Sequence, residues 1–296
     1  MSSYSGAYQT RNAVLEGLEQ NASLFVDANF IERMKAMDML ELHMLDMIGQ
    51  AENDSEEAHF IERVEVLKQK LDNANDGLFA QLLGHIRSND CATVSQYIKQ
   101  AGQQSSSQIS DLGYDELDML VNGLLEVNLT PSEPDKRDVG MMFYQPTPAR
   151  IILKLIEELE PAANDIFYDL GSGIGHVPIM MTLLTGIKSK GVELENSYIQ
   201  YSEECLNKLS LPSVEFINVD ARHADYSDGT IFYLYTPFRG EVLQQVLARL
   251  ETESKQRPIR VCAYGPCTLQ VSKQNWLRPL YQTGKRENNL GIFASV

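Results

Sequence analysis

A glycine-rich segment, Asp169-Leu170-Gly171-Ser172-Gly173-Ile174-Gly175, constrains the fold of this chain more than any other feature. An apolar run, Ile166-Phe167-Tyr168, precedes it and is typical of a strand, and an apolar helix is predicted over 177–184. Glycines at a strand-to-helix junction let the chain turn tightly and let a ligand approach the backbone. The helix start behind them offers unpaired amides and the positive end of the helix dipole. The segment therefore predicts an α/β fold with a ligand site at this junction.

The pattern around this junction extends the α/β prediction to residues 139–296. Further strands are predicted over 188–194, 214–219, 231–235 and 259–264, with helices over 149–159, 197–209 and 241–250. Strands that alternate with helices imply a parallel sheet with right-handed crossovers. The final strands, 280–283 and 290–295, are joined by a polar turn. We therefore expect a Rossmann-like, mostly parallel seven-stranded sheet that ends in an antiparallel hairpin.

Residues 1–138 show a different pattern, in which apolar side chains recur at helical spacing and no strand pattern appears. The apolar stripes cover 24–37, 60–71, 78–86, 94–101 and 117–124. The stretch from Thr130 to Asp135 contains two prolines, which cannot continue a helix, so we place a domain boundary there. The sequence thus predicts an acidic, all-α helical domain over 1–138 and an α/β domain over 139–296.

Charge separates the same two regions. The chain has 25 basic and 41 acidic residues, a net charge of −16. Residues 1–138 hold 24 acids and 10 bases, which gives −14, whereas residues 139–296 hold 17 and 15, which gives −2. An acidic surface repels phosphates, so free nucleic acid and anionic membranes are disfavoured as partners. Its field attracts cations, so we expect the helical domain to recognise or shield a basic protein or a small cationic molecule.

The sequence also limits location and metal chemistry. The stretch from Met1 to Gly6 lacks the basic and then apolar pattern of a signal peptide, and no run of about 20 apolar residues is present. The four cysteines are scattered, without the spacing of a metal site. We therefore expect a cytoplasmic protein with reduced thiols and no bound metal.

Acidic residues at the ends of three predicted strands favour one class of ligand. Asp169 enters the glycine-rich segment, Glu193 ends the next strand 18 positions after Gly175, and Asp220 ends the third. A carboxylate in the place of Glu193 suits ribose hydroxyls. A dinucleotide site normally has G-x-G-x-x-G, but the position of its third glycine is His176 here. The carboxylate of Asp169 also suits an ammonium group better than a pyrophosphate.

The order of an acid, G-x-G-x-G, a second acid and a third acid resembles the class I S-adenosylmethionine-dependent methyltransferases, over about residues 144–296. The resemblance implies S-adenosylmethionine as the cofactor. By this resemblance, the glycine-rich segment would cradle the methionine end of the cofactor and Glu193 would hold the ribose hydroxyls. Asp220 with Ala221 would face the adenine ring.

Within that superfamily the chain is most similar to the non-SET histone-lysine methyltransferases of the disruptor-of-telomeric-silencing type. The similarity rests on Tyr144-Gln145-Pro146-Thr147, on the glycine-rich segment and on Gly191-Val192-Glu193. The chain departs from that family at His176, at Tyr235-Thr236-Pro237-Phe238 and in lacking a basic tail. The cofactor-binding residues implied are Tyr144, Thr147, Asp169, Gly171, Ser172, Gly173, Gly175, Glu193, Asp220 and Ala221.

The sequence therefore predicts an S-adenosylmethionine-dependent methyltransferase, with Tyr235 and Thr236 as candidate catalytic residues where the acceptor atom should arrive. A protein lysine or another cationic amine is the first candidate acceptor. An RNA or small-molecule methyltransferase and a non-catalytic cofactor-binding protein are the alternatives. Because the glycine-rich segment, Glu193 and Asp220 all follow residue 165, we expect the helical domain to be dispensable for the cofactor site.

Overall fold

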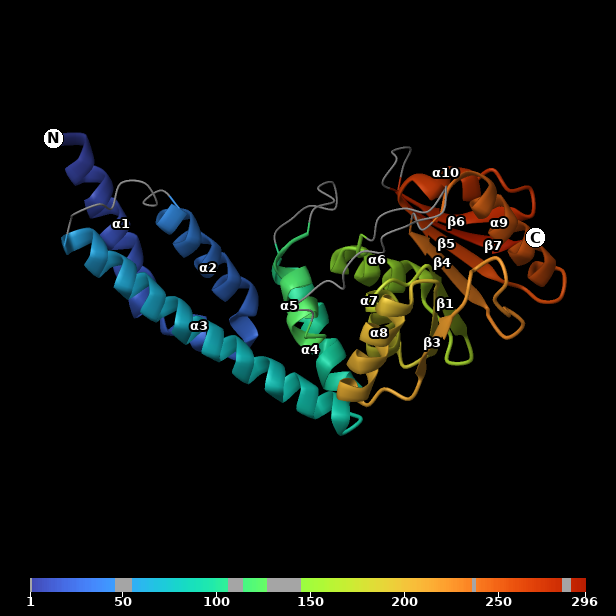
Figure 1. The fold of residues 1–296 in the computed structure, drawn as a ribbon, viewed down its shortest axis with the longest axis horizontal. Helices are drawn as coiled ribbons and strands as arrows, with labels where there is room; N and C mark the ends of the chain where they lie inside the picture. The colour runs from blue at the N-terminus through green and yellow to red at the C-terminus, as the bar shows by residue number, and fades with distance from the viewer. Residues whose placement is uncertain (1, 46–54, 106–113, 127–144, 236–237, 284–288) are drawn as a thin grey trace.

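A computed structural model describes residues 2–45, 55–105, 114–126, 145–235, 238–283 and 289–296 (Figure 1). The amino-terminal elements are α1 (Ser2–Gln20), two 3₁₀ turns (Ala22–Phe25 and Asp27–Asn29), α2 (Phe30–Leu45), α3 (Ser55–Arg87), α4 (Cys91–Gln104) and α5 (Glu116–Leu124). The predicted boundary between residues 138 and 139 falls outside the described residues, and the division into two domains stays a prediction.

The carboxy-terminal elements alternate as the sequence predicts. The helices are α6 (Ala149–Leu159), α7 (His176–Thr185), α8 (Asn196–Leu209), α9 (Gly240–Ser254) and α10 (Thr268–Val271). The strands are β1 (Ile166–Leu170), β2 (Lys188–Glu193), β3 (Val214–Asn218), β4 (Ile231–Tyr235), β5 (Arg260–Tyr264), β6 (Leu277–Gln282) and β7 (Leu290–Ser295).

These strands form one seven-stranded sheet in the order β3-β2-β1-β4-β5-β7-β6. The first five in this order pair in parallel, and β7 pairs antiparallel with both β5 and β6. The carboxyl ends of β1, β2 and β4 therefore meet at one edge of the sheet, where the chain leaves each strand toward the glycine-rich segment, Glu193 and Tyr235. The predicted Rossmann-like fold with a terminal hairpin is confirmed.

Helix α7 explains why the amino-terminal helices lie against this sheet. Its residues from His176 to Leu184 are all buried. A helix that is apolar all round needs cover on every side. The sheet covers one side of α7, while α4 and α6 pack on others, and Ser95 of α4 donates a hydrogen bond to the carbonyl of Leu184 at 3.3 Å. Helix α4 thus shares the core of the sheet.

Three clusters of buried apolar residues stabilise the molecule. The largest runs from the start of α2 (Phe30 and Ile31) and from α3, α4 and α5 through α6 and α7 to the sheet, and a second lies between the sheet and α9. The third joins α1, α2 and the first half of α3. We call α1, α2 and residues 55–71 of α3 the arm, because they project away from the sheet (Figure 1).

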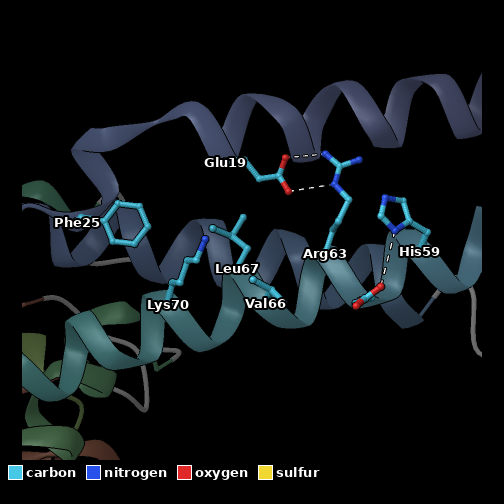
Figure 2. Close-up of a pocket in the computed structure, with 8 residues that line it drawn as sticks. Glu19, Phe25, His59, Arg63, Val66, Leu67 and Lys70 are labelled. Atoms are coloured by element: carbon cyan, nitrogen blue, oxygen red, sulfur yellow. Dashed lines mark hydrogen bonds and ion pairs between the residues drawn. The ribbon is translucent and has the colours of Figure 1, made fainter.

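A groove crosses the arm between α1 and α3 (Figure 2). Beside it, Arg63 of α3 donates two hydrogen bonds to the carboxylate of Glu19 on α1, at 3.1 and 2.6 Å. The ring of Phe25 lies at one end of the groove and is 40% exposed. A two-point arginine–carboxylate contact fixes orientation as well as distance, so it sets how α1 lies along α3.

Candidate functional site

The glycine-rich segment turns from β1 into α7 with three residues in the left-handed region. Gly171, Gly173 and Gly175 have φ values of +86°, +52° and +86°, a region that side chains with a Cβ rarely adopt. The amides of Gly171 and Ser172 donate to the carbonyl of Val192 at 2.8 and 3.1 Å. The segment is therefore fastened to the end of β2.

Glycine is also required by close packing. A Cβ on Gly175 or on Gly191 would lie 2.3 or 2.5 Å from the ring of Phe216 on β3. The same Cβ on Gly191 would lie 2.6 Å from Oγ of Ser172. The similarity at Gly191 noted in the sequence thus has a steric reason: the segment lies directly on the backbone of β2.

Glu193 ends β2 beside this segment. Its Oε2 accepts a hydrogen bond from the amide of Gly173 at 2.9 Å, and its Oε1 accepts from the amides of Leu194 and Glu195 at 2.8 and 2.9 Å. Burial raises the pKa of this carboxyl group, and the three amides partly offset the rise. A carboxylate offers about four lone-pair positions, so Glu193 can hold the segment and still accept from a ligand hydroxyl.

Asp169 lies at the base of the same segment and is 4% exposed. Burial raises the pKa of its carboxyl group well above the ordinary value, and the negative charge of Glu193 raises it further. Among the described residues, no side chain forms an ion pair with it. A ligand that brings a positive charge to Asp169 would stabilise the ionised carboxylate.

Thr147 and His176 also lie in this region. Oγ1 of Thr147 and the hydroxyl of Tyr233 on β4 lie 3.1 Å apart, and both side chains are buried. Nε2 of His176 lies 2.9 Å from Oδ1 of Asn122 on α5. Burial lowers the pKa of His176 to about 4, so its imidazole is neutral at pH 7.

These residues line one small pocket. Its described lining is Gln145, Pro146, Thr147, Asp169, Gly171, Ser172, His176, Val177 and Tyr235. The ring of Tyr235 packs on that of Tyr264 at the end of β5, with 4.8 Å between ring centroids. The predicted residues Tyr144 and Thr236 lie outside the described residues, so their roles stay predictions.

Asp220 and Ala221 lie after β3, away from this pocket's lining. The guanidinium of Arg222 donates to Oδ1 of Asp220 at 3.0 Å and to Oδ2 at 2.6 Å, and the amide of Arg222 donates to Oδ1 at 2.8 Å. These contacts hold the pKa of Asp220 below its usual range. Ala221 is buried, and its carbonyl accepts from the hydroxyl of Tyr226. Their predicted contact with adenine stays a prediction.

Helix α5 contacts residues at the edge of this site, although none of its described residues lines the pocket, and the expectation that the amino-terminal helices are dispensable for the cofactor site stays a prediction. Besides Asn122, α5 contributes Asp118, whose Oδ1 accepts from the amide of Ala149 at 2.7 Å. The sequence pattern does not indicate a role at the site for these residues or for Tyr233. The aspartate spacing at 115–118 is a helix-start signal, but nothing in it indicates a partner 31 residues away.

Other chemistry is limited in the part of the chain that the structure describes. No three histidine, cysteine, aspartate or glutamate side chains are grouped there as metal ligands. No described helix combines the length and the apolar character that crossing a membrane requires.

Comparison with known proteins places this site in context. A family described as "Histone methylation protein DOT1" matches residues 141–229, a range that contains Thr147, the glycine-rich segment and Glu193. No curated protein matches the chain.

Similar solved structures include an RNA methyltransferase from Salinibacter ruber in complex with S-adenosyl-L-homocysteine. It is 22% identical, covers 51% of this chain and 94% of its own, and has a TM-score of 0.44. A putative RNA methyltransferase from Pyrococcus horikoshii is 14% identical, with coverages of 60% and 98% and a TM-score of 0.44. The tRNA (uracil-54, C5)-methyltransferase of Pyrococcus abyssi is 18% identical, with coverages of 52% and 40% and a TM-score of 0.40.

Proposed function

Because the chain is a class I S-adenosylmethionine-dependent methyltransferase, we propose that it methylates the amino group of a cationic acceptor, with a protein lysine as the first candidate. The lining of the small pocket carries this proposal. Apart from Asp169, which this proposal gives to the cofactor, its described residues include the neutral imidazole of His176 and the phenol of Tyr235, but no lysine or arginine. Proteins hold phosphate-bearing acceptors with cationic side chains. Carboxylates and aromatic faces hold cationic amines.

The tyrosines beside the pocket support the same class of acceptor. Burial raises the pKa of both Tyr235 and Tyr264 above the ordinary value, so both phenols stay neutral at pH 7. Tyr114, just before α5, is close enough to raise both values further. Neutral aromatic faces attract a cation by roughly 0.5–2 kcal/mol each, depending on how far it is desolvated.

The residues present fit the cofactor. Oγ of Ser172 is buried and has no hydrogen-bond partner among the described residues. Among the residues that the structure describes, no cationic side chain pairs with Asp169, and Glu193 retains acceptor capacity. When bound, S-adenosylmethionine would supply the methyl group: the acceptor nitrogen, after losing its proton to solvent, would attack the methyl carbon in line as the carbon–sulfur bond breaks and S-adenosylhomocysteine leaves. In this proposal Asp169 and the glycine-rich segment bind the methionine end, Glu193 binds the ribose, and Tyr235 orients the acceptor and excludes water.

The test offers the full chain three acceptors in the presence of methyl-labelled S-adenosylmethionine: a lysine-rich protein, total RNA, and a small diamine. We expect label in the protein or the diamine. Binding of the cationic acceptor should weaken with added salt. The net charge of −16 attracts the acceptor through exposed charges, and salt screens that attraction. Label in RNA alone, or transfer that is indifferent to salt, would contradict the proposal.

Tyr235 supplies the matched variants. Tyr235→Phe keeps the ring, whereas Tyr235→Leu removes it. We expect the leucine variant to lose about tenfold in kcat/KM for the cationic acceptor, equivalent to about 1.4 kcal/mol, and the phenylalanine variant to retain most of it. Equal losses of kcat/KM in the two variants would show that the aromatic ring of Tyr235 has no part in holding the acceptor.

A further inference from the structure

Helix α6 begins without a cap of its own. Its N-cap residue is Pro148, which makes no side-chain hydrogen bond. The amide of Ala149, the first in α6, instead donates to Oδ1 of Asp118 at 2.7 Å. Oδ2 of Asp118 accepts from the amide of Asp115 at 2.8 Å and closes the capping box of α5. One carboxylate, 8% exposed, therefore caps two helices that lie far apart in the sequence.

The residues just before α6 form one wall of the small pocket. The hydroxyl of Tyr114 donates to the carbonyl of Pro146 at 2.8 Å, on one side of Thr147. Asp118 holds Ala149 on the other side. Oγ1 of Thr147 itself lies 3.1 Å from the hydroxyl of the buried Tyr233 on β4. The position of Thr147 is thus set from both sides by groups at the start of α5.

The same helix also contacts a second residue that lines the pocket, His176. Asn122 lies four residues, or about one turn, after Asp118, and its Oδ1 contacts His176 at the start of α7. No residue in α5 lines the pocket among the described residues. The helix can influence a ligand in the pocket only through the residues that it holds.

We propose that Asp118 is a positioning residue for cofactor binding, which acts by holding Thr147 in place from α5. The inference rests on the proposed assignment of Thr147 to the cofactor site. It gives the amino-terminal helical region a part in building the catalytic centre, in addition to any role in recognising the acceptor. Because Asp118 does not touch the pocket, its effect must be lost when Thr147 can no longer respond.

A double-mutant cycle on the full chain tests this coupling. S-Adenosylhomocysteine affinity is measured by titration calorimetry for Asp118→Asn, Thr147→Val and the double variant. Asparagine keeps the shape but turns an NH₂ group toward one of the two amides. We expect each single variant to bind about tenfold more weakly, and the double variant to bind no more weakly than the worse single one. Met119→Ala, on the same helix and 43% exposed, is the matched control and should bind normally.

Tyr114→Phe provides a second route if Asp118→Asn folds poorly, because Tyr114 is 50% exposed and only its hydroxyl is removed. We expect about a threefold loss that disappears in the Thr147→Val background. The KM for the cofactor should rise in these variants while kcat at saturating cofactor stays nearly constant, which a loss of overall stability would not produce.

These experiments distinguish the positioning role of Asp118 from the assignment of Thr147 to the cofactor site. If Thr147→Val weakens binding but Asp118→Asn and Tyr114→Phe do not, or if their effects add to it, the positioning role is overturned and the site assignment stands. If Thr147→Val binds normally, the assignment of Thr147 is wrong and the inference falls with it.

Discussion

At the scale of single residues, His176 is a buried base that stays neutral. Burial lowers its pKa to about 4, and its Nε2 contacts Asn122. The unfolded chain has an ordinary histidine pKa of about 6.5. At pH values between these two pKa values, His176 binds a proton in the unfolded chain but not in the folded chain. The contribution of His176 to the free energy of unfolding therefore falls as the pH falls. Above pH 6.5 both states are neutral and the effect vanishes.

We therefore expect His176→Gln to flatten the acid side of the stability profile. The native chain should lose, through this one group, roughly 1.4 kcal/mol per pH unit below the unfolded pKa, or about 2 kcal/mol between pH 7 and pH 5. Denaturant unfolding of both chains at the two pH values measures this difference. Other titrating groups, such as Asp169, are common to both chains and cancel. Parallel pH profiles would show that the histidine is not held neutral.

The spacing of Asp169 and Glu193 from the glycines predicted that both acids face a ligand. In the structure both lie beside the glycine-rich segment, and their contact with a ligand stays a prediction. The sequence did not identify Asp118 or Asn122. Their partners, Ala149 and His176, lie 31 and 54 residues further along the chain. Local spacing reports which residues share one element, but it does not report which distant backbone amide a carboxylate will meet.

At the scale of elements, the packing of α5 on α3 depends on a glycine. A Cβ on Gly123 would lie 2.1 Å from Cζ of Phe79, whose partly buried aromatic ring packs against the largest apolar cluster. Gly77, on α3, has nothing within 4 Å of the same added atom. Alanine at Gly123 therefore tests the close helix contact, whereas alanine at Gly77 tests the intrinsic helix propensity alone.

We expect Gly123→Ala to lower the free energy of unfolding by roughly 1–3 kcal/mol, because the ring must be displaced. Gly77→Ala should raise it by up to about 1 kcal/mol, because alanine favours a helix over glycine. Denaturant titration followed by circular dichroism gives both values. Equal stabilisation in the two variants would mean that α3 and α5 are not in this contact.

Helix periodicity predicted these elements but not what covers them. The stripes that contain Leu82, Ile98 and Leu120 were predicted as a separate helical domain, whereas in the structure they share one cluster with Ile152 and Ile231. An apolar stripe shows which face of a helix is buried, but it does not show which element covers that face. The all-round apolar character of α7 was the available signal that more than one layer covers it. A chain that began at residue 139 would expose this face, and we expect it to be insoluble.

At the scale of the whole molecule, two of the three apolar clusters meet along a single helix. Phe60, Val64 and Leu71 of α3 belong to the arm, and Leu78 and Leu82 to the cluster shared with the sheet. The arm cluster is much the smaller of the two. The hydroxyl of Tyr97 on α4 donates to the carbonyl of Asp27 at 2.5 Å and ties the arm to the rest of the molecule.

One continuous helix should therefore exchange its amide hydrogens with solvent at two different rates. Amides up to Leu71 should exchange through opening of the arm alone, whereas those from Leu78 onward should require the cooperative unfolding that also opens the sheet. Native-state hydrogen–deuterium exchange, read peptide by peptide along α3, measures this step. Uniform protection along α3 would mean that the arm and the sheet unfold together. The 33 residues of α3 would then couple the two parts into one cooperative unit.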